Sequence, residues 1–227
     1  MDEHPTCPPP RLSVATLDNK TSEEVMRNCL GADRAASQHH CHEHRRLQFL
    51  QGRRSARDLL PAGQWRIEAD PDGRPLVLAE DGSRGPDLSI SHSGAWVAAA
   101  LAERGRVGID VEIPRHHRSP QAIADSYLSA AERRAVAMDG EPALLAFWTM
   151  REAIAKLSGG GLAAALALDG AALPLGRNAC CGGAEWVVAH RDCGAFQIAM
   201  AWSASPLPDQ AAAMLAAALD AALRERA

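Results

Sequence analysis

A mixed α/β fold is predicted by three features of this 227-residue sequence. Short apolar segments bounded by glycine, proline and aspartate indicate strands, and longer segments with capping residues and helical spacing indicate helices. Hydrophobic residues make up 47% of the chain but aromatic ones only 4%, so we expect a helix-rich core of small side chains. The length allows one large domain or two small ones with ample buried core.

The N-terminal part of the chain is expected to contain one strand and two helices. Residues 1–10 include four prolines and are expected to form a loose tail or an extended edge. Residues 11–17 alternate partly and predict a strand, and Thr21-Ser-Glu-Glu24 is a capping signal for a helix over 23–30. A second helix is predicted over 43–60. It carries five arginines: Arg45, Arg46, Arg53, Arg54 and Arg57.

The rest of the chain is predicted as strands, then helices, then a hairpin and a helix. The predicted strands cover 64–69, 76–79, 87–91, 95–102 and 107–113. Asp72-Gly73 marks a hairpin turn between the first two of these strands. Helices are predicted from Ala130 to Met138 and from Pro142 to Leu157. A hairpin over 184–190 and 195–203 and an alanine-rich packing helix over 208–225 complete the expected elements.

Two acidic residues lie two apart in the segment Val107-Gly-Ile-Asp-Val-Glu112. Its β-prone residues predict a short buried strand, on which Asp110 and Glu112 point to the same face. Neighbouring carboxylates repel each other, and a divalent cation removes that repulsion. Carboxylate oxygens suit Mg²⁺, which also takes waters and phosphate oxygens as ligands. The alternative interpretation is a strand end that carries two solvated acids.

The helix predicted up to Leu157 places Trp148, Glu152 and Lys156 on one face, because they are spaced i, i+4 and i+8. The following Ser158-Gly-Gly-Gly161 segment is suited to end a helix. An exposed Glu–Lys pair is the alternative, and it contributes only a few tenths of a kcal/mol, about 0.2–0.5. Together with the Asp-x-Glu strand, this helix supplies a third acid for a metal and a lysine for a phosphate.

Charge and composition exclude several classes of function. The net charge of −4 argues against general nucleic-acid binding. The first residues, Met1-Asp-Glu-His4, lack the basic and apolar regions of a signal peptide, and no apolar run is long enough to span a membrane. We therefore expect a cytoplasmic protein whose six cysteines are reduced thiols. The run from His39 to His44 offers imidazole and thiolate ligands for zinc. Contiguous ligands rarely close a tetrahedral site, so a polar surface run is the favoured interpretation.

The chain resembles the phosphopantetheinyl transferases of the surfactin-synthetase-activating type. The motifs that carry the resemblance come in the family's order between about residues 45 and 162. They are Gly73-Arg-Pro75, Ser89-Ile-Ser-His-Ser-Gly94, Gly108-Ile-Asp-Val-Glu112, Tyr127-Leu-Ser-Ala-Ala-Glu132, Trp148-Thr-Met-Arg-Glu-Ala-Ile-Ala-Lys156 and Gly161-Leu162. The most specific motifs are those over Gly108–Glu112 and Trp148–Lys156.

The resemblance implies a fold of two similar α/β subdomains related by a pseudo-two-fold, with the active site between them. We expect an N-terminal subdomain over 1–113 and a C-terminal subdomain over 114–227. It also implies a monomer that uses coenzyme A and Mg²⁺, with Mn²⁺ as the alternative ion. The partners would be apo acyl, peptidyl or aryl carrier proteins, with no nucleic acid and no membrane. The expected reaction moves the 4'-phosphopantetheine arm to a carrier serine and releases adenosine 3',5'-bisphosphate.

The resemblance further implies roles for individual residues. Asp110, Glu112 and Glu152 would hold the metal. The residues expected to bind coenzyme A are Arg53, Arg57, Arg74, Ser91, His92, Asp110 and Lys156. Phosphate beside the His92 imidazole would raise its pKa.

Catalytic roles are implied for Lys156, Glu132 and Glu152. Lys156 would stabilise the leaving bisphosphate, and Glu132 would deprotonate the carrier serine, directly or through water. Arg74 and Arg151 stand where the family more often has lysine, and Glu132 also fits a helix N-terminal acid favoured by the dipole. Two other functions stay open: a non-catalytic module that binds coenzyme A or a carrier, and a metal-dependent nucleotide hydrolase.

Overall fold

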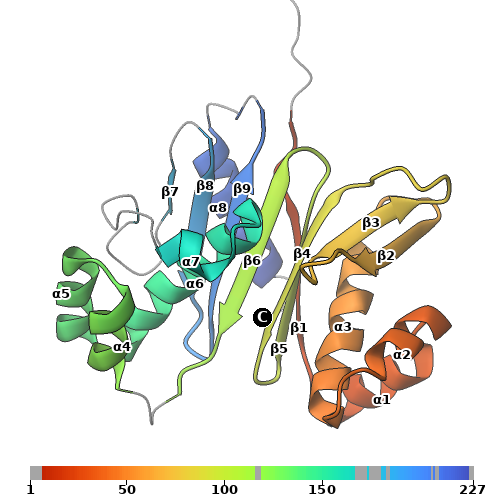
Figure 1. The fold of residues 1–227 in the computed structure, drawn as a ribbon, viewed down its shortest axis with the longest axis horizontal. Helices are drawn as coiled ribbons and strands as arrows, with labels where there is room; N and C mark the ends of the chain where they lie inside the picture. Colours follow the sequence, from red (N-terminus) through yellow and green to blue (C-terminus); the bar gives the residue numbers. More distant parts are fainter. Residues whose placement is uncertain are drawn as a thin grey trace, which may run out of the picture.

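The computed structural model describes residues 7–115, 119–166, 173, 180–182, 185–205, 207 and 210–224. Strands run through the middle of the fold, with α1 to α3 on one side and α4 to α7 on the other (Figure 1). The elements in chain order are β1 (Arg11–Thr16), α1 (Asn19–Asn28), α2 (Gly31–Ser37), α3 (Glu43–Leu59), β2 (Trp65–Ala69), β3 (Pro75–Ala79), β4 (Asp87–Ser93), β5 (Trp96–Ala102), β6 (Arg106–Glu112), α4 (Pro120–Tyr127), α5 (Ala130–Asp139), α6 (Glu141–Ser158), α7 (Gly161–Leu166), β7 (Cys180–Gly182), β8 (Val187–Asp192), β9 (Gln197–Ser203) and α8 (Ala211–Arg224).

The strands form two main antiparallel sheets and one hairpin. The first sheet has the order β1-β5-β4, the second has the order β6-β9-β8-β7, and β2 pairs with β3 alone. One apolar core contains side chains from β1, β5, β6, β8, β9 and α8, so the two sheets share a common layer. Separate cores lie under α3 and under α4 to α6. Alternate residues of β5 and β9 point into the shared core, where α8 packs, and the residues between them point into the cores under α3 and α6. Helix α8 therefore lies on the opposite face of the sheets from α3 and α6.

Side chains, and not a backbone ladder, join the two sheets where β4 and β6 lie side by side. The side chain of every second residue of β4 accepts a hydrogen bond from the backbone N–H of every second residue from Val107 in β6 to Ile113 directly after it. The pairs, with acceptor first, are Asp87–Val107 at 2.8 Å, Ser89–Ile109 at 3.1 Å, Ser91–Val111 at 3.4 Å and Ser93–Ile113 at 3.3 Å. Both residue numbers rise together, so the two strands run parallel. The ladder satisfies the outer edge of β6, which would otherwise leave buried donors unpaired.

Helix α6 lies directly on β6 because Gly108 has no side chain. A Cβ atom at this position would come within 1.9 Å of the Ala153 carbonyl oxygen and 2.7 Å of the Leu157 nitrogen. The helix then ends at Gly159, whose φ of 74° is the left-handed conformation of a glycine C-cap. The strand that carries Asp110 is therefore fixed against the helix that carries Glu152 and Lys156.

Most predicted elements are confirmed, and the omissions are short. The strands and long helices are present with shifts of a few residues, but the first predicted helix begins at Asn19 and not at residue 23. The Thr21 capping side chain lies outside the described side chains. Sequence analysis did not predict α2, α4, α7 or β7. With three to eight residues each, these elements are too short to show a clear hydrophobic period.

Among the helices of the described chain, none has an apolar stretch of the length that crossing a bilayer requires. Cysteine side chains that the structure describes are free thiols: Cys7, Cys29, Cys41 and Cys193.

Candidate active site

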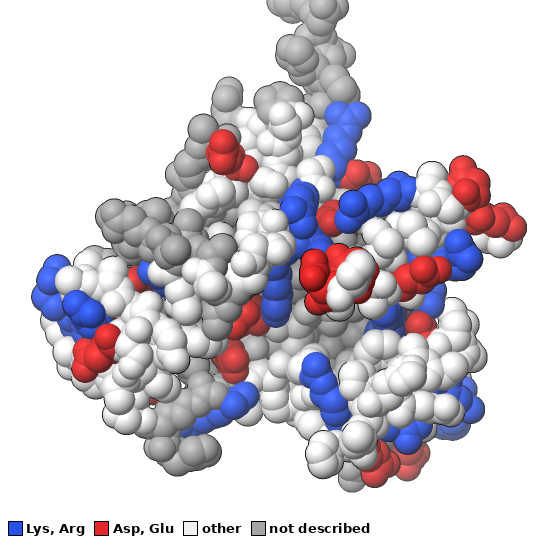
Figure 2. Space-filling view, in the orientation of Figure 1, with Lys and Arg blue, Asp and Glu red and all other residues white. Residues whose placement is uncertain are grey.

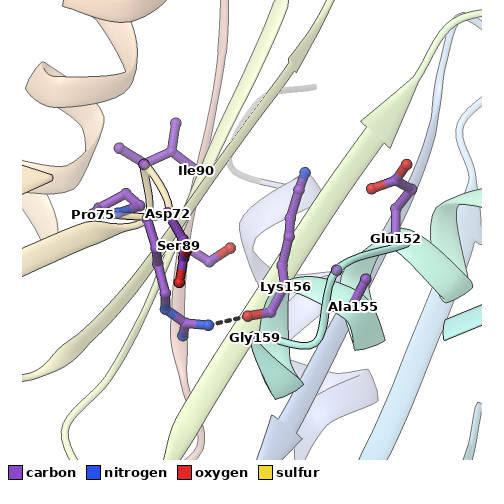
Figure 3. A pocket seen from close by; sticks show the side chains of 11 residues that line it. Asp72, Pro75, Ser89, Ile90, Glu152, Ala155, Lys156 and Gly159 are labelled. Atoms are coloured by element: carbon purple, nitrogen blue, oxygen red, sulfur yellow. Dashed lines mark hydrogen bonds between the residues drawn. The ribbon is translucent and has the colours of Figure 1, made fainter. Parts of the chain in front are cut away.

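A cavity of about 300 Å³ lies between the β3–β4 region and α6, close to the contact between the sheets. Glu152, Ala155 and Lys156 line it from α6 (Figure 3). The opposite wall is formed by Asp72, Gly73, Arg74, Pro75, Ser89 and Ile90. The structure thus brings the Gly73-Arg-Pro75 motif, the serine-rich β4 motif and the α6 motif to one cavity.

Lys156 and Asp110 are in direct contact beside this cavity. The Lys156 Nζ atom donates to Asp110 Oδ1 at 2.7 Å, to Ser91 Oγ at 2.9 Å and to the Ile109 carbonyl at 3.1 Å. These three bonds use all three donors of the ammonium group. Ser91 in turn donates to the same Asp110 oxygen at 2.7 Å. Ser91 therefore orients both charged groups.

The other two predicted acids lie near Asp110. Glu112 Oε2 accepts from the Ser93 hydroxyl at 2.8 Å, so a β4 serine orients this carboxylate as well. The pKa of Glu152 is raised, first by burial and then by the negative charge of Asp110, with Glu112 as a smaller cause; the positive charge of Lys156 acts in the opposite direction. This mutual influence shows that the three acids share one electrostatic environment.

The three acids fit a divalent cation in charge and in ligand type, but they do not converge on one point. Asp110 Oδ2 is buried and has no partner among the described groups, and a cation is a natural partner for it. A cation would also relieve the like-charge repulsion that raises the Glu152 pKa. Within the described ranges, however, no three His, Cys, Asp or Glu side chains lie close enough to hold an ion as they stand. For these three acids to hold one ion, at least one side chain would have to rotate.

His92 is placed next to Arg45, an arginine of α3 that was not among the residues expected to bind coenzyme A. Arg45 Nη1 donates to His92 Nδ1 at 2.7 Å, while His44 and Gln48 of the same α3 turn bond the Gly94 carbonyl at 2.9 and 2.8 Å. Burial, and then the charges of Arg45 and Lys156, lower the pKa of His92 to about 4. The protein alone therefore holds this imidazole neutral, and a raised pKa beside a phosphate stays a prediction.

The arginines predicted to bind coenzyme A take different positions. Arg53 is buried, stacks over Phe49 and donates to the Glu68 carbonyl at 3.4 Å. Arg57 forms an ion pair with the buried Asp33 at 2.9 Å. Arg74 lines the cavity, but its guanidinium is bound to other protein groups. As folded, neither Arg53 nor Arg57 lines the cavity beside Lys156.

Glu132 is fully buried, and both of its oxygens are occupied by Arg151 at 2.8–3.2 Å. Its Oε2 also accepts from the Ser129 N–H at 2.8 Å, which completes a capping box at the start of α5. The Arg151 side chain is only 1% exposed. The pair joins α5 to α6, and as folded it offers no carboxylate oxygen to an external substrate.

Sequence analysis missed the positioning role of β4. Asp87, Ser89, Ser91 and Ser93 recur with period two, which places four polar side chains on one face of a strand. That period was the available signal for the ladder.

The His39–His44 run shows no metal cluster among its described side chains. Basic and acidic side chains are intermixed over the described part of the face in Figure 2, with no broad basic stripe there.

Comparisons with known proteins agree with the motifs. Residues 106–180 match the family model described as the 4'-phosphopantetheinyl transferase superfamily. The chain is 35% identical over 95 residues to 4'-phosphopantetheinyl transferase AcpT of Salmonella typhimurium, which covers 37% of this chain and 50% of that protein. It is 33% identical over 107 residues to 4'-phosphopantetheinyl transferase psf-1 of Bacillus pumilus, which covers 45% of this chain and 43% of that protein.

The predicted resemblance to this superfamily is confirmed by these matches. The chain spans about half the length of the curated relatives it matches. The family-model match begins at the first residue of β6 and includes the whole of α6, the two elements that carry the acids and Lys156.

Proposed function

We propose, on the premise that this chain resembles the 4'-phosphopantetheinyl transferase superfamily, that it transfers the 4'-phosphopantetheine arm of coenzyme A to a serine of an apo carrier protein. The other product would be adenosine 3',5'-bisphosphate. The observation that carries the proposal is the contact of Lys156 with Asp110 at 2.7 Å beside a cavity that Glu152 also lines. A lysine and carboxylates at one cavity are the groups that phosphoryl-group transfer requires.

The cavity is proposed to take the phosphates of coenzyme A. Lys156 lies on its wall, and Arg45 and His92 form a second polar group near the same lysine, whose charge affects the His92 pKa. A phosphate has the right charge to meet these donors and would raise the His92 pKa. For Arg53 and Arg57 a phosphate role would require them to leave their present partners, so we assign them a supporting role in α3.

Asp110, Glu112 and Glu152 are proposed to hold Mg²⁺, or Mn²⁺ in its place. The ion, when bound, would neutralise charge on the pyrophosphate as the anhydride bond between its two phosphates breaks. Ser91 and Ser93 hold two of these carboxylates in place from β4. Lys156 is then proposed to exchange one of its three present acceptors for the leaving bisphosphate and to donate to it.

Glu132 is proposed to be a positioning residue for α5 and α6, in place of the base implied by the resemblance. Its burial and its bonds to Arg151 support this assignment. The proton of the carrier serine would then leave through water. This keeps Glu132 in the sequence-predicted motif but changes its task.

We further propose a monomer of two pseudo-two-fold-related subdomains that meet along the β4–β6 ladder. Each main sheet pairs with one long helix, α3 or α6, which supports this division. The boundary predicted at residue 113 separates β6 from β9, yet these strands pair from Arg106 to Glu112. We therefore place β6 with the second subdomain.

Intact-mass spectrometry of several apo carrier proteins, incubated with the chain, coenzyme A and Mg²⁺, tests the proposal. Addition of the phosphopantetheine mass to a serine, lost on chelation of the metal, is the expected result. A non-catalytic coenzyme A-binding or carrier-binding module would bind coenzyme A or a carrier but give no mass addition. A nucleotide hydrolase would release the bisphosphate with no carrier protein present.

A further inference from the structure

We propose that Arg74 and Asp87 form a clamp that fixes the C-terminal end of α6 to β6 and so positions Lys156 in the cavity. The clamp gives Arg74 a positioning role in place of the phosphate-binding role predicted from sequence. The importance of the clamp for catalysis rests on the proposed transferase function. The existence of the clamp as a structural link does not depend on that function.

The Arg74 guanidinium reaches three segments of the chain at once. Its Nη2 atom donates to Asp87 Oδ2 at 2.5 Å and to the Val107 carbonyl at 3.2 Å. Its Nη1 atom donates to the carbonyls of Lys156 and Leu157 in the last turn of α6. The dashed line in Figure 3 marks the bond to the Lys156 carbonyl. The planar guanidinium of Arg74 therefore connects the β2–β3 turn to β4, β6 and α6.

Asp87 completes the link on the strand side. Besides Arg74, its Oδ2 atom accepts from the Val107 N–H at 2.8 Å, as the first step of the ladder between β4 and β6. Both side chains are largely buried, with Arg74 14% exposed and Asp87 11% exposed. Removing either partner leaves the other as a buried charge without its counterion, which is strongly unfavourable. A phosphate would have to displace this counterion before it could take the guanidinium.

The end of α6 needs such a partner. The last four carbonyls of a helix have no partner within the helix, and cations near this end are favourable. Arg74 meets the carbonyls of Lys156 and Leu157, and Arg106 meets that of Ser158 at 3.0 Å. The backbone that carries the Lys156 side chain is thus held directly. Displacement of this turn would move the ammonium away from Asp110.

The test is a comparison of Arg74→Ala, Asp87→Asn and the double variant with wild type. Arg66→Ala is the matched control, because Arg66 is an exposed β2 arginine with a side chain 61% exposed. Amide hydrogen exchange over residues 153–159, coenzyme A binding by calorimetry and the transfer rate are measured for each. Arg74→Gln, which keeps part of the donor function, serves as a second variant if Arg74→Ala fails to fold.

We expect Arg74→Ala and Asp87→Asn each to speed exchange in the last turn of α6 and to lower the transfer rate about tenfold or more. Coenzyme A affinity should change by less than about threefold, judged against a typical loss of tenfold or more for a charged contact. The double variant should be no worse than either single one, because both remove one link. Arg66→Ala should match wild type in all three measurements.

The two roles of Arg74 give opposite results at Asp87. If Arg74 bound phosphate, Arg74→Ala would weaken coenzyme A binding, while Asp87→Asn would free the arginine and leave binding equal or tighter. Either this pattern of coenzyme A binding, or unchanged amide hydrogen exchange in the last turn of α6 of the Asp87→Asn variant, would contradict the clamp. If wild type shows no transfer to any carrier, the proposed function fails. Exchange and coenzyme A binding would still decide the clamp.

Discussion

Lys156 Nζ and Asp110 Oδ1 lie 2.7 Å apart, and the Ser91 hydroxyl contacts both. The lysine comes from α6 and the aspartate from β6, which Gly108 allows to approach each other closely. The residue proposed to stabilise the leaving group therefore touches a residue proposed to hold the metal. Their contact makes metal binding and leaving-group stabilisation two properties of one small site.

Replacing Lys156 should affect turnover more than binding. Lys156→Ala removes a donor proposed to act on negative charge that develops in the transition state, so the transfer rate should fall at least about a hundredfold. Coenzyme A affinity, measured by calorimetry, should fall far less. Lys156→Arg keeps the charge and is the matched variant. Transfer at the wild-type rate in Lys156→Ala would remove this role.

Removing any of the three acids should weaken metal binding. We expect Asp110→Ala, Glu112→Ala and Glu152→Ala each to lose most transfer activity, because each takes one ligand from a shared ion. Binding of Mn²⁺, followed by electron paramagnetic resonance, should weaken in the same three variants. The exposed acid Glu68 on β2 offers a control, Glu68→Ala. Full activity of Asp110→Ala, or of wild type in chelator, would contradict the metal site.

Glu132 should prove necessary for stability and not for proton transfer. Glu132→Gln removes the carboxylate charge that pairs with the buried Arg151 guanidinium, and breaking such a pair costs about 3–5 kcal/mol. The thermal midpoint should therefore drop strongly. At a temperature where the variant is folded, its transfer rate and pH profile should stay close to wild type. A base role would instead lower the rate by a factor of about 10²–10⁴.

The residues that sequence patterns predicted best are those whose roles depend on local spacing. Asp110 and Glu112 share a strand face, and Glu152 and Lys156 share a helix face, as their spacing indicates. Partner choice across the fold was not predictable. The spacing of Arg74 says nothing about Asp87 or the end of α6, and a motif glutamate such as Glu132 looks the same whether exposed or buried.

The α3 arginines show a further limit of the sequence. A helix with many arginines predicts a basic face, but each guanidinium finds its own partner in the fold. Arg57 pairs with Asp33, and Arg53 points to Glu68. Arg45, in the first turn of the helix, is the one that bonds His92. Tertiary contacts, which no local pattern encodes, decide which of several like charges reaches a site.

Gly108 should not tolerate a side chain. Gly108→Ala places a Cβ within 1.9 Å of the Ala153 carbonyl, a backbone group that cannot move without shifting α6. Overpacking of this kind typically costs about 1–3 kcal/mol, and the shift should also separate Lys156 from Asp110 and slow transfer. The matched control is Gly31→Ala, where nothing lies within 4 Å of the added Cβ. Equal denaturation midpoints for the two variants would contradict the close contact.

The buried imidazole of His190 should make the protein less stable as the pH falls. Burial lowers the pKa of His190 from 6.5 to about 4, against smaller raising effects of the Gln197 bond and of Asp192. His190 Nε2 donates to Gln197 Oε1 at 3.0 Å, because the Gln197 amide nitrogen donates to the Pro142 carbonyl. The Nδ1 atom is buried and has no partner among the described groups, so a proton added there would find no acceptor.

The direction of the pH effect on stability follows from comparing proton binding in the folded and the unfolded chain. The unfolded chain binds a proton at His190 below about pH 6.5, while the folded chain resists this down to about pH 4. Protonation therefore favours unfolding, and stability is lost progressively between those two pH values. At about 1.4 kcal/mol per pH unit, the loss of unfolding free energy has an upper limit of about 3 kcal/mol.

His190→Gln keeps a donor for Gln197 but cannot titrate, so its unfolding free energy should fall less between pH 7 and pH 4.5 than that of wild type. Urea unfolding at a series of pH values measures the difference, and comparison with wild type cancels the contribution of His92. Parallel profiles for the two proteins would show that His190 does not control this acid sensitivity.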